Sequence, residues 1–237
     1  MAILRLILAC STIFLVACPL NAGPDSGTVT GIITFKGTLP KAKPFDLAKE
    51  PACVKMHATD PLVDETVVTG RGNGLANVVV YISSGEADTA AVAASSVNFK
   101  QQGCRYKTHV LAIRAGQEIN IVNNDPISHN IHAAAKVNRE WSRIQPPGTP
   151  PFSYSYEKEE VIPVKCNIHP WMQGYFVVLK TSHFSVTAED GIFHLPDLPP
   201  GKYTVTAWHE SLGTQSQEIT VTAGATTSMY FTFLAGP

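Results

Sequence analysis

The stretch KCNIHPWMQGYFVV at residues 165–178 decides between a helix and a pair of strands. Cys166, His169 and Met172 recur every three residues, which is a spacing found along one face of a helix. Pro170 opposes a helix, because it lacks a backbone N–H donor and disfavours helical geometry at the residue before it. The β-branched apolar run GYFVV favours extended chain. The sequence therefore predicts a strand, a tight loop and a second strand.

The rest of the chain carries strand patterns of the same kind. Short β-branched runs alternate with Gly and Pro turns, and helical periodicity is nearly absent. Three clear examples are GTVTGIITFKG at 27–37, LANVVVYI at 75–82 and HVLAIRAGQEINIVNN at 109–124. We therefore expect an all-β protein.

The first 22 residues read as an export signal. They hold Arg5, then an apolar run, and end in small residues. An alternative is the bacterial lipobox LVAC, in which Cys18 would be a lipid anchor. No later stretch is long and apolar enough to cross a bilayer, so no transmembrane segment is expected. In both cases we expect the mature chain to work outside the cytoplasm, in the periplasm or on a membrane anchor.

The charge of the chain is close to zero. The full sequence has a formal net charge of −1. Removal of the export signal takes away Arg5 and no acidic residue, which leaves a net charge of about −2 on the same formal count. Such a surface gives no reason to expect nucleic acid as a partner.

Three cysteines remain after the export signal, and an odd number leaves one thiol outside any disulfide. Because exported chains oxidise paired thiols, we favour a disulfide between Cys53 and Cys104, with Cys166 left for a metal. The alternative is a second metal site built from CVKMH and CRYKTH, with His57 and His109 as further ligands. Neither spacing is a strong zinc signature.

The loop CNIHPWM brings together a thiolate, an imidazole and a thioether. These soft donors suit copper better than magnesium, calcium or a closed zinc site. A blue copper site needs one more imidazole. His129 and His132 lie in NNDPISHNIH, directly after a predicted strand that ends in a polar turn. We assign the imidazole to His129, with His132 as the rival.

INIVNNDPISHNIH followed by KCNIHPWMQGYFVV resembles the cupredoxins, the blue type 1 copper proteins of the amicyanin and plastocyanin kind. The resemblance covers residues 98–181 and implies one copper ion. It implies four ligands, His129, Cys166, His169 and Met172. It also implies that Asn130 ties the two ligand loops together.

The flanking segments are similar to the carboxypeptidase regulatory-like or transthyretin-like β-sandwich. TAEDGIFHLPDLPPGKYTVTAWH at 187–209 carries the Asp-Gly and Leu-Pro-Pro-Gly-x-Tyr parts of that pattern. Its two halves, residues 27–84 and 185–235, lie on either side of the cupredoxin-like segment. We therefore expect a cupredoxin Greek-key β-sandwich inserted in, or packed on, a second, prealbumin-like β-sandwich.

The resemblance implies an electron carrier that cycles between Cu(I) and Cu(II). A redox partner, such as a c-type cytochrome or a dehydrogenase, would meet the edge of His169, framed by Pro170, Trp171 and Met172. Two alternatives are copper handling in the envelope, and a structural or carbohydrate-binding module. We expect no catalysis, because the chain has no His-x-His pair for a substrate-binding copper.

Overall fold

The computed structural model describes residues 25–39, 41, 43–85 and 95–235. The regular secondary structure of this part of the chain is almost entirely strand, with one short helix, α1 (Pro51–Met56), and a single turn of 3₁₀ helix. The predicted all-β fold is confirmed. The predicted export signal and Cys18 lie outside the described residues. Where the chain is described, its helices lack the length and apolarity that a membrane crossing requires.

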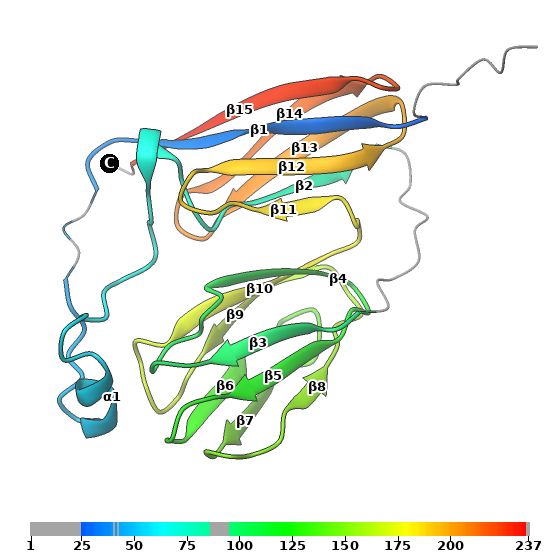
Figure 1. The fold of residues 1–237 in the computed structure, drawn as a ribbon. Coiled ribbons are helices and arrows are strands. Elements are labelled where there is room, and N and C mark those ends of the chain that lie inside the picture. Colours follow the sequence, from blue (N-terminus) through cyan, green and yellow to red (C-terminus); the bar gives the residue numbers. More distant parts are fainter. Residues whose placement is uncertain (1–24, 40, 42, 86–94, 236–237) are drawn as a thin grey trace, which may run out of the picture.

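The outer sandwich is built from the two ends of the chain (Figure 1). One of its sheets has the strand order β12-β1-β15, and the other has the order β11-β2-β13-β14. These strands are β1 (Gly27–Lys36), β2 (Val79–Ser84), β11 (Phe184–Val186), β12 (Ile192–Leu198), β13 (Gly201–His209), β14 (Gly213–Val221) and β15 (Thr226–Leu234). β1 alternates buried and more exposed residues, as a strand with one face on a core must.

The inner sandwich is built from the middle of the chain. A five-stranded sheet of order β4-β10-β9-β6-β7 faces a three-stranded sheet of order β3-β5-β8. The strands are β3 (Val97–Gln101), β4 (Val110–Arg114), β5 (Ile119–Asn123), β6 (His129–Ala133), β7 (Trp141–Gln145), β8 (Phe152–Tyr154), β9 (Glu160–Lys165) and β10 (Gln173–Leu179). An apolar core that includes Phe99, Ile121 and Phe176 fills the space between the sheets.

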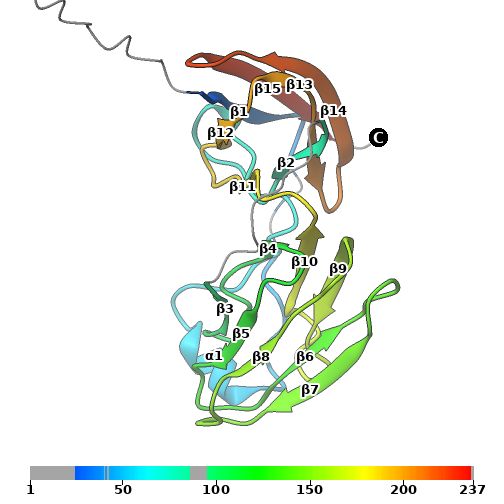
Figure 2. The ribbon, with the colours of Figure 1, turned by 90° about the vertical axis from the view of Figure 1, so that its right-hand side faces the viewer.

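The inner sandwich is an insertion into the outer one. β2 and β11 pair antiparallel, with Phe184 opposite Tyr81, although the whole inner sandwich separates them in sequence. The chain therefore leaves the outer sandwich after β2 and re-enters the same sheet at β11. Figures 1 and 2 show the two sandwiches stacked with β4 and β10 facing the outer one.

β10 explains why the two sandwiches hold together. Phe176 and Val178 point into the inner core, whereas Val177 and Leu179 belong to a cluster that also contains Val79 of β2. Alternate side chains of one strand thus pack into two different apolar clusters. This double burial is the reason that the predicted strand reads as a continuous apolar run rather than as an alternating one.

Candidate metal centre

Strand pairing brings the predicted ligands together at one end of the inner sandwich. His129 is the first residue of β6, and Cys166 directly follows β9. β6 and β9 pair antiparallel through their last residues, with His132 opposite Lys165, so the start of β6 extends past the end of β9 along the segment that begins at Cys166. β9 and β10 also pair, and the loop between them is closed by a 3.0 Å hydrogen bond from the Cys166 amide to the Met172 carbonyl. His169 lies inside this loop, and its carbonyl accepts a 2.9 Å bond from the Met172 amide.

Three donor atoms converge in the interior. The Nδ1 atoms of His129 and His169 lie 3.0 Å apart, and the Cys166 sulfur lies 3.8 Å from His169 Nδ1. One atom from each residue falls within 4.8 Å of the others. All three side chains are buried. Among the histidines, cysteines and acidic residues of the described ranges, this is the group that could hold a metal ion.

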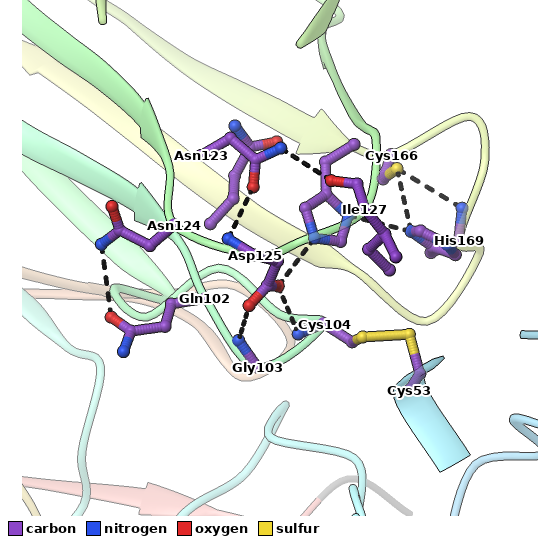
Figure 3. A network of polar contacts seen from close by, with 12 residues as sticks. Cys53, Gln102, Gly103, Cys104, Asn123, Asn124, Asp125, Ile127, Cys166 and His169 are labelled. Atoms are coloured by element: carbon purple, nitrogen blue, oxygen red, sulfur yellow. Dashed lines mark hydrogen bonds and ion pairs between the residues drawn. A yellow bond between two sulfur atoms is a disulfide. The ribbon is translucent and has the colours of Figure 1, made fainter. Parts of the chain in front are cut away.

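The ring of His129 is oriented by a carboxylate. Its Nε2 lies 2.7 Å from Asp125 Oδ2, and an ionised carboxylate can only accept a hydrogen bond. The Nε2 atom therefore carries the proton in the neutral ring, and Nδ1 presents a lone pair toward the other donors. Burial by itself raises the pKa of Asp125. Hydrogen bonds from His129 and from the amides of Cys104 and Gly103 outweigh burial and lower that pKa below its usual value. Figure 3 shows the Asp125 carboxylate beside the amides of Gly103 and Cys104.

The Cys166 sulfur is prepared as a thiolate. Burial raises the pKa of the Cys166 thiol. The neighbouring imidazoles of His129 and His169, in the form that carries a proton on Nδ1, and hydrogen bonds donated by the amides of His169 and Asn130 outweigh burial and lower the pKa to about 6. The amides lie 3.4 Å and 3.3 Å from the sulfur, respectively. The thiolate is therefore the main form at neutral pH, and the thiolate is the form that binds metals.

The donor set fits a soft metal ion. Two bare imidazole nitrogens and a thiolate point at one another, and without a shared proton or cation their lone pairs would repel. Each donor is held by a second group, as metal ligands in proteins usually are. Met172 is buried in the same apolar cluster as Cys166, so its role as a ligand stays a prediction.

Asn130 links the two ligand loops, as the resemblance implies. Its side-chain oxygen accepts a 3.2 Å hydrogen bond from the Asn167 amide, and its side-chain nitrogen donates to Ser142. His132 lies apart from the donor atoms. Its ring bonds Glu140 at 2.6 Å and Asn167 at 3.2 Å. Residues three apart in a strand point to opposite faces, which separates His132 from His129.

The predicted disulfide between Cys53 and Cys104 is present. It leaves Cys166 as the free cysteine of the described ranges. The alternative of a second metal site at these cysteines is wrong, because both sulfurs are used in the disulfide. His57 bonds backbone carbonyls instead, with Nε2 2.8 Å from the Gly103 oxygen.

The edge of His169, which was expected to meet a redox partner, is covered in the structure. The His169 side chain is only 2% exposed, and its Nε2 lies 3.4 Å from Glu50 Oε2. Sequence reasoning missed Glu50 and Asp125. Asp125 carried a local signal, because it lies four residues before His129 in the quoted polar turn. Glu50 lies 119 residues from His169 and carried none.

An all-β chain with a buried group of one thiolate and two imidazoles defines a β-sandwich protein with a candidate site for a soft metal. The model of the carboxypeptidase regulatory-like domain matches residues 172–233, which extend from the start of β10 into β15. The matched residues comprise β10 of the inner sandwich and the strands of the outer sandwich from β11 into β15. No curated protein matches the chain.

Solved structures similar to the chain include two amicyanin variants and one nitrite reductase. An oxidised proline-to-glycine variant of amicyanin is 22% identical, covers 42% of this chain and 98% of its own, and has a TM-score of 0.33. A reduced proline-to-phenylalanine variant is 24% identical, with the same coverage and TM-score. The copper-containing nitrite reductase of Thermus scotoductus SA-01 is 21% identical, covers 38% of this chain and 25% of its own, and has a TM-score of 0.33.

Proposed function

We propose that this chain is an exported type 1 copper protein that carries one electron at a time between redox partners. The observation that carries the proposal is the convergence of two imidazole nitrogens and a thiolate within 4.8 Å of one another, in a buried position. This donor set suits copper in both of its common oxidation states. Met172 would be the fourth and more weakly bound ligand in this proposal.

Bound copper would supply the exchange of a single electron, and the chain's own residues prepare the site for it. Asp125 keeps the proton on His129 Nε2, so that Nδ1 stays free to bind. The amides of Asn130 and His169 stabilise negative charge on the Cys166 sulfur and thereby tune the reduction potential. Strand pairing and burial fix the donors and exclude water, which keeps rearrangement small when the charge of the site changes.

The alternatives receive less support from the geometry. Copper handling calls for donors that a second protein can reach, whereas the His169 and Met172 residues are 2% and 1% exposed. For the carrier we propose a protein partner, such as a c-type cytochrome or a dehydrogenase, and no catalysis of its own. We place the protein in the periplasm or at a membrane surface outside the cytoplasm.

The test is a copper titration read by visible spectroscopy. The wild-type chain with Cu(II) should give an intense thiolate-to-copper charge-transfer band, and Cys166→Ser should give none. His132→Gln is the matched control and should keep the full band. Met172→Leu should keep the copper and shift its reduction potential. A colourless wild-type protein, or a band that survives Cys166→Ser, would refute the proposal.

A further inference from the structure

The segment between β1 and β2 makes a long excursion across the molecule. Figure 1 shows it leaving the outer sandwich, running down beside the inner one to α1 and returning. We name residues 43–66 the strap. Its two arms are joined by a 2.9 Å hydrogen bond from the Phe45 amide to the Leu62 carbonyl, and Pro44 bridges Val63. The strap is therefore a closed loop laid against the inner sandwich.

Three contacts fasten the strap to the turn that follows β3. The disulfide joins Cys53 of α1 to Cys104, and both residues are fully buried. His57 Nε2 bonds the Gly103 carbonyl. Glu65 forms a 2.7 Å ion pair with Arg105. The disulfide is the covalent contact among these three, so it sets the tightest limit on how far the strap can move from the inner sandwich.

The same turn is fastened to the candidate metal centre. Trp171 Nε1 donates a 3.0 Å hydrogen bond to the Cys104 carbonyl, and the Trp171 ring packs on the His169 ring with centroids 5.2 Å apart. Leu47 and Leu62 of the strap pack in one apolar cluster with Trp171. The strap, the turn and the ligand loop thus form one packed unit.

The strap also covers the donor that would otherwise face solvent. Glu50, directly before α1, places its carboxylate 3.4 Å from His169 Nε2. The His169 side chain is left with 2% of its surface exposed, whereas Glu50 itself is 30% exposed. A reagent that approaches His169 from this side meets the strap first.

We infer that the strap is a cover, latched by the Cys53–Cys104 disulfide, that controls access to the His169 side of the site. Metal exchange, and any direct contact of a protein partner with His169, then require the strap to move. The inference rests on the proposed function for its role in copper retention. The cover itself is a property of the chain alone and is measured without copper.

The test uses the full chain with Cys53→Ala and Cys104→Ala together. In the copper-free protein, alkylation of Cys166 by iodoacetamide, read by peptide mass spectrometry, should be at least tenfold faster than in the wild type. In the copper-loaded protein, transfer of copper to a chelator should speed up by a similar factor. An unchanged rate of Cys166 alkylation would overturn the inference.

Two further variants keep the test decisive. Val205→Ala weakens the outer core, which includes no residue of the strap, so it should lower the melting temperature and leave alkylation slow. If it speeds alkylation as much as loss of the disulfide does, access comes from general unfolding and the inference fails. Glu50→Ala keeps the disulfide and should speed alkylation several-fold, with Glu50→Gln restoring most of the protection. The Glu50→Ala variant tests the cover even if the double cysteine variant does not fold. Equal rates of Cys166 alkylation in Glu50→Ala and in the wild type would then count against the cover.

The outcomes separate the two proposals. If the wild type binds no copper but the disulfide still controls Cys166 alkylation, the function fails and the cover stands. If copper binds with the expected band and loss of the disulfide changes neither alkylation nor copper release, the function stands and the cover fails.

Discussion

At the scale of single residues, carboxylates on two sides decide which imidazole nitrogens face the centre. Asp125 lies at the Nε2 atom of His129, and Glu50 lies at the Nε2 atom of His169. Each carboxylate favours a proton on Nε2 and so leaves Nδ1 bare. The two residues come from unrelated parts of the chain, yet they impose the same tautomer on both rings. Their strengths differ, because Asp125 is buried and close, whereas Glu50 is more exposed and more distant.

Asp125 should therefore matter strongly for metal binding. Asp125→Ala removes the acceptor that holds the His129 ring, and we expect a loss of copper affinity of roughly 10- to 100-fold. Asp125→Asn keeps an acceptor oxygen and should lose less. The measurement is a competition titration against a chelator of known affinity. Glu140→Ala, which removes the equivalent partner of His132, should leave the affinity unchanged. Wild-type affinity in Asp125→Ala would contradict this account of the ring.

The convergence of His129, Cys166 and His169 could be anticipated from the sequence because much of the geometry is local. Cys166, His169 and Met172 share one short loop whose shape follows from Pro170 and from the strands on either side. His129 needed one assumption, that its strand pairs beside the loop, and the turn before it supplied the hint. Glu50 was not predictable. It reaches the site only through the fold of the strap and through a disulfide between two cysteines that are 51 residues apart in sequence.

At the scale of elements, β10 connects the candidate metal centre to the outer sandwich. Its first residues close the ligand loop, and its later residues pack on both sides. The sequence predicted this strand but not its second packing face, since a continuous apolar run does not reveal which neighbour covers each side. The small helix α1 was also missed, because six residues opened by a proline carry too little periodicity to stand out.

Leu179 tests the coupling between the sandwiches. It is 2% exposed and belongs to the cluster between them. Leu179→Ala should cost about 2–5 kcal/mol of unfolding free energy. It should also broaden or split the thermal transition in calorimetry, because it weakens the contact between two separate cores. Phe176→Ala, in the inner core alone, should cost about 3–5 kcal/mol and lower the inner transition. Identical transition shapes for the two variants would show that β10 does not couple the sandwiches in this way.

At the scale of the whole molecule, buried ionisable groups lie where the sandwiches meet. His109, just before β4, forms an ion pair with Glu210, just after β13. Burial lowers the pKa of His109, but the hydrogen bond and the charge of Glu210 outweigh this and raise the pKa above its usual value. This pair therefore contributes stability below about pH 6.5 and loses it as the pH rises through the folded-state pKa. His209 is the residue before Glu210, and its pKa is shifted in the opposite direction, below the usual value.

His209 should make the protein sensitive to acid. It is fully buried, and its Nδ1 accepts a 3.3 Å hydrogen bond from the Ser211 amide. Burial, with the charge of His109 adding to it and that of Glu210 opposing, lowers the pKa of His209 to about 4. The unfolded chain takes up this proton near pH 6.5, before the folded chain does. The free energy of unfolding should thus fall by about 3 kcal/mol from this residue as the pH drops from 7 to 4.

The acid loss can be isolated with His209→Asn, which keeps an acceptor near the Nδ1 position and does not titrate. Urea unfolding of both proteins between pH 7 and pH 4 gives the difference, in which every other titrating group cancels to first order. The difference in the free energy of unfolding between wild type and variant should close or reverse as the pH falls. Only the wild type gains a proton at this position when it unfolds. If the two curves stay parallel, His209 is not held neutral in the fold. The burial of an imidazole at the junction of the sandwiches would then have no linkage to acid stability.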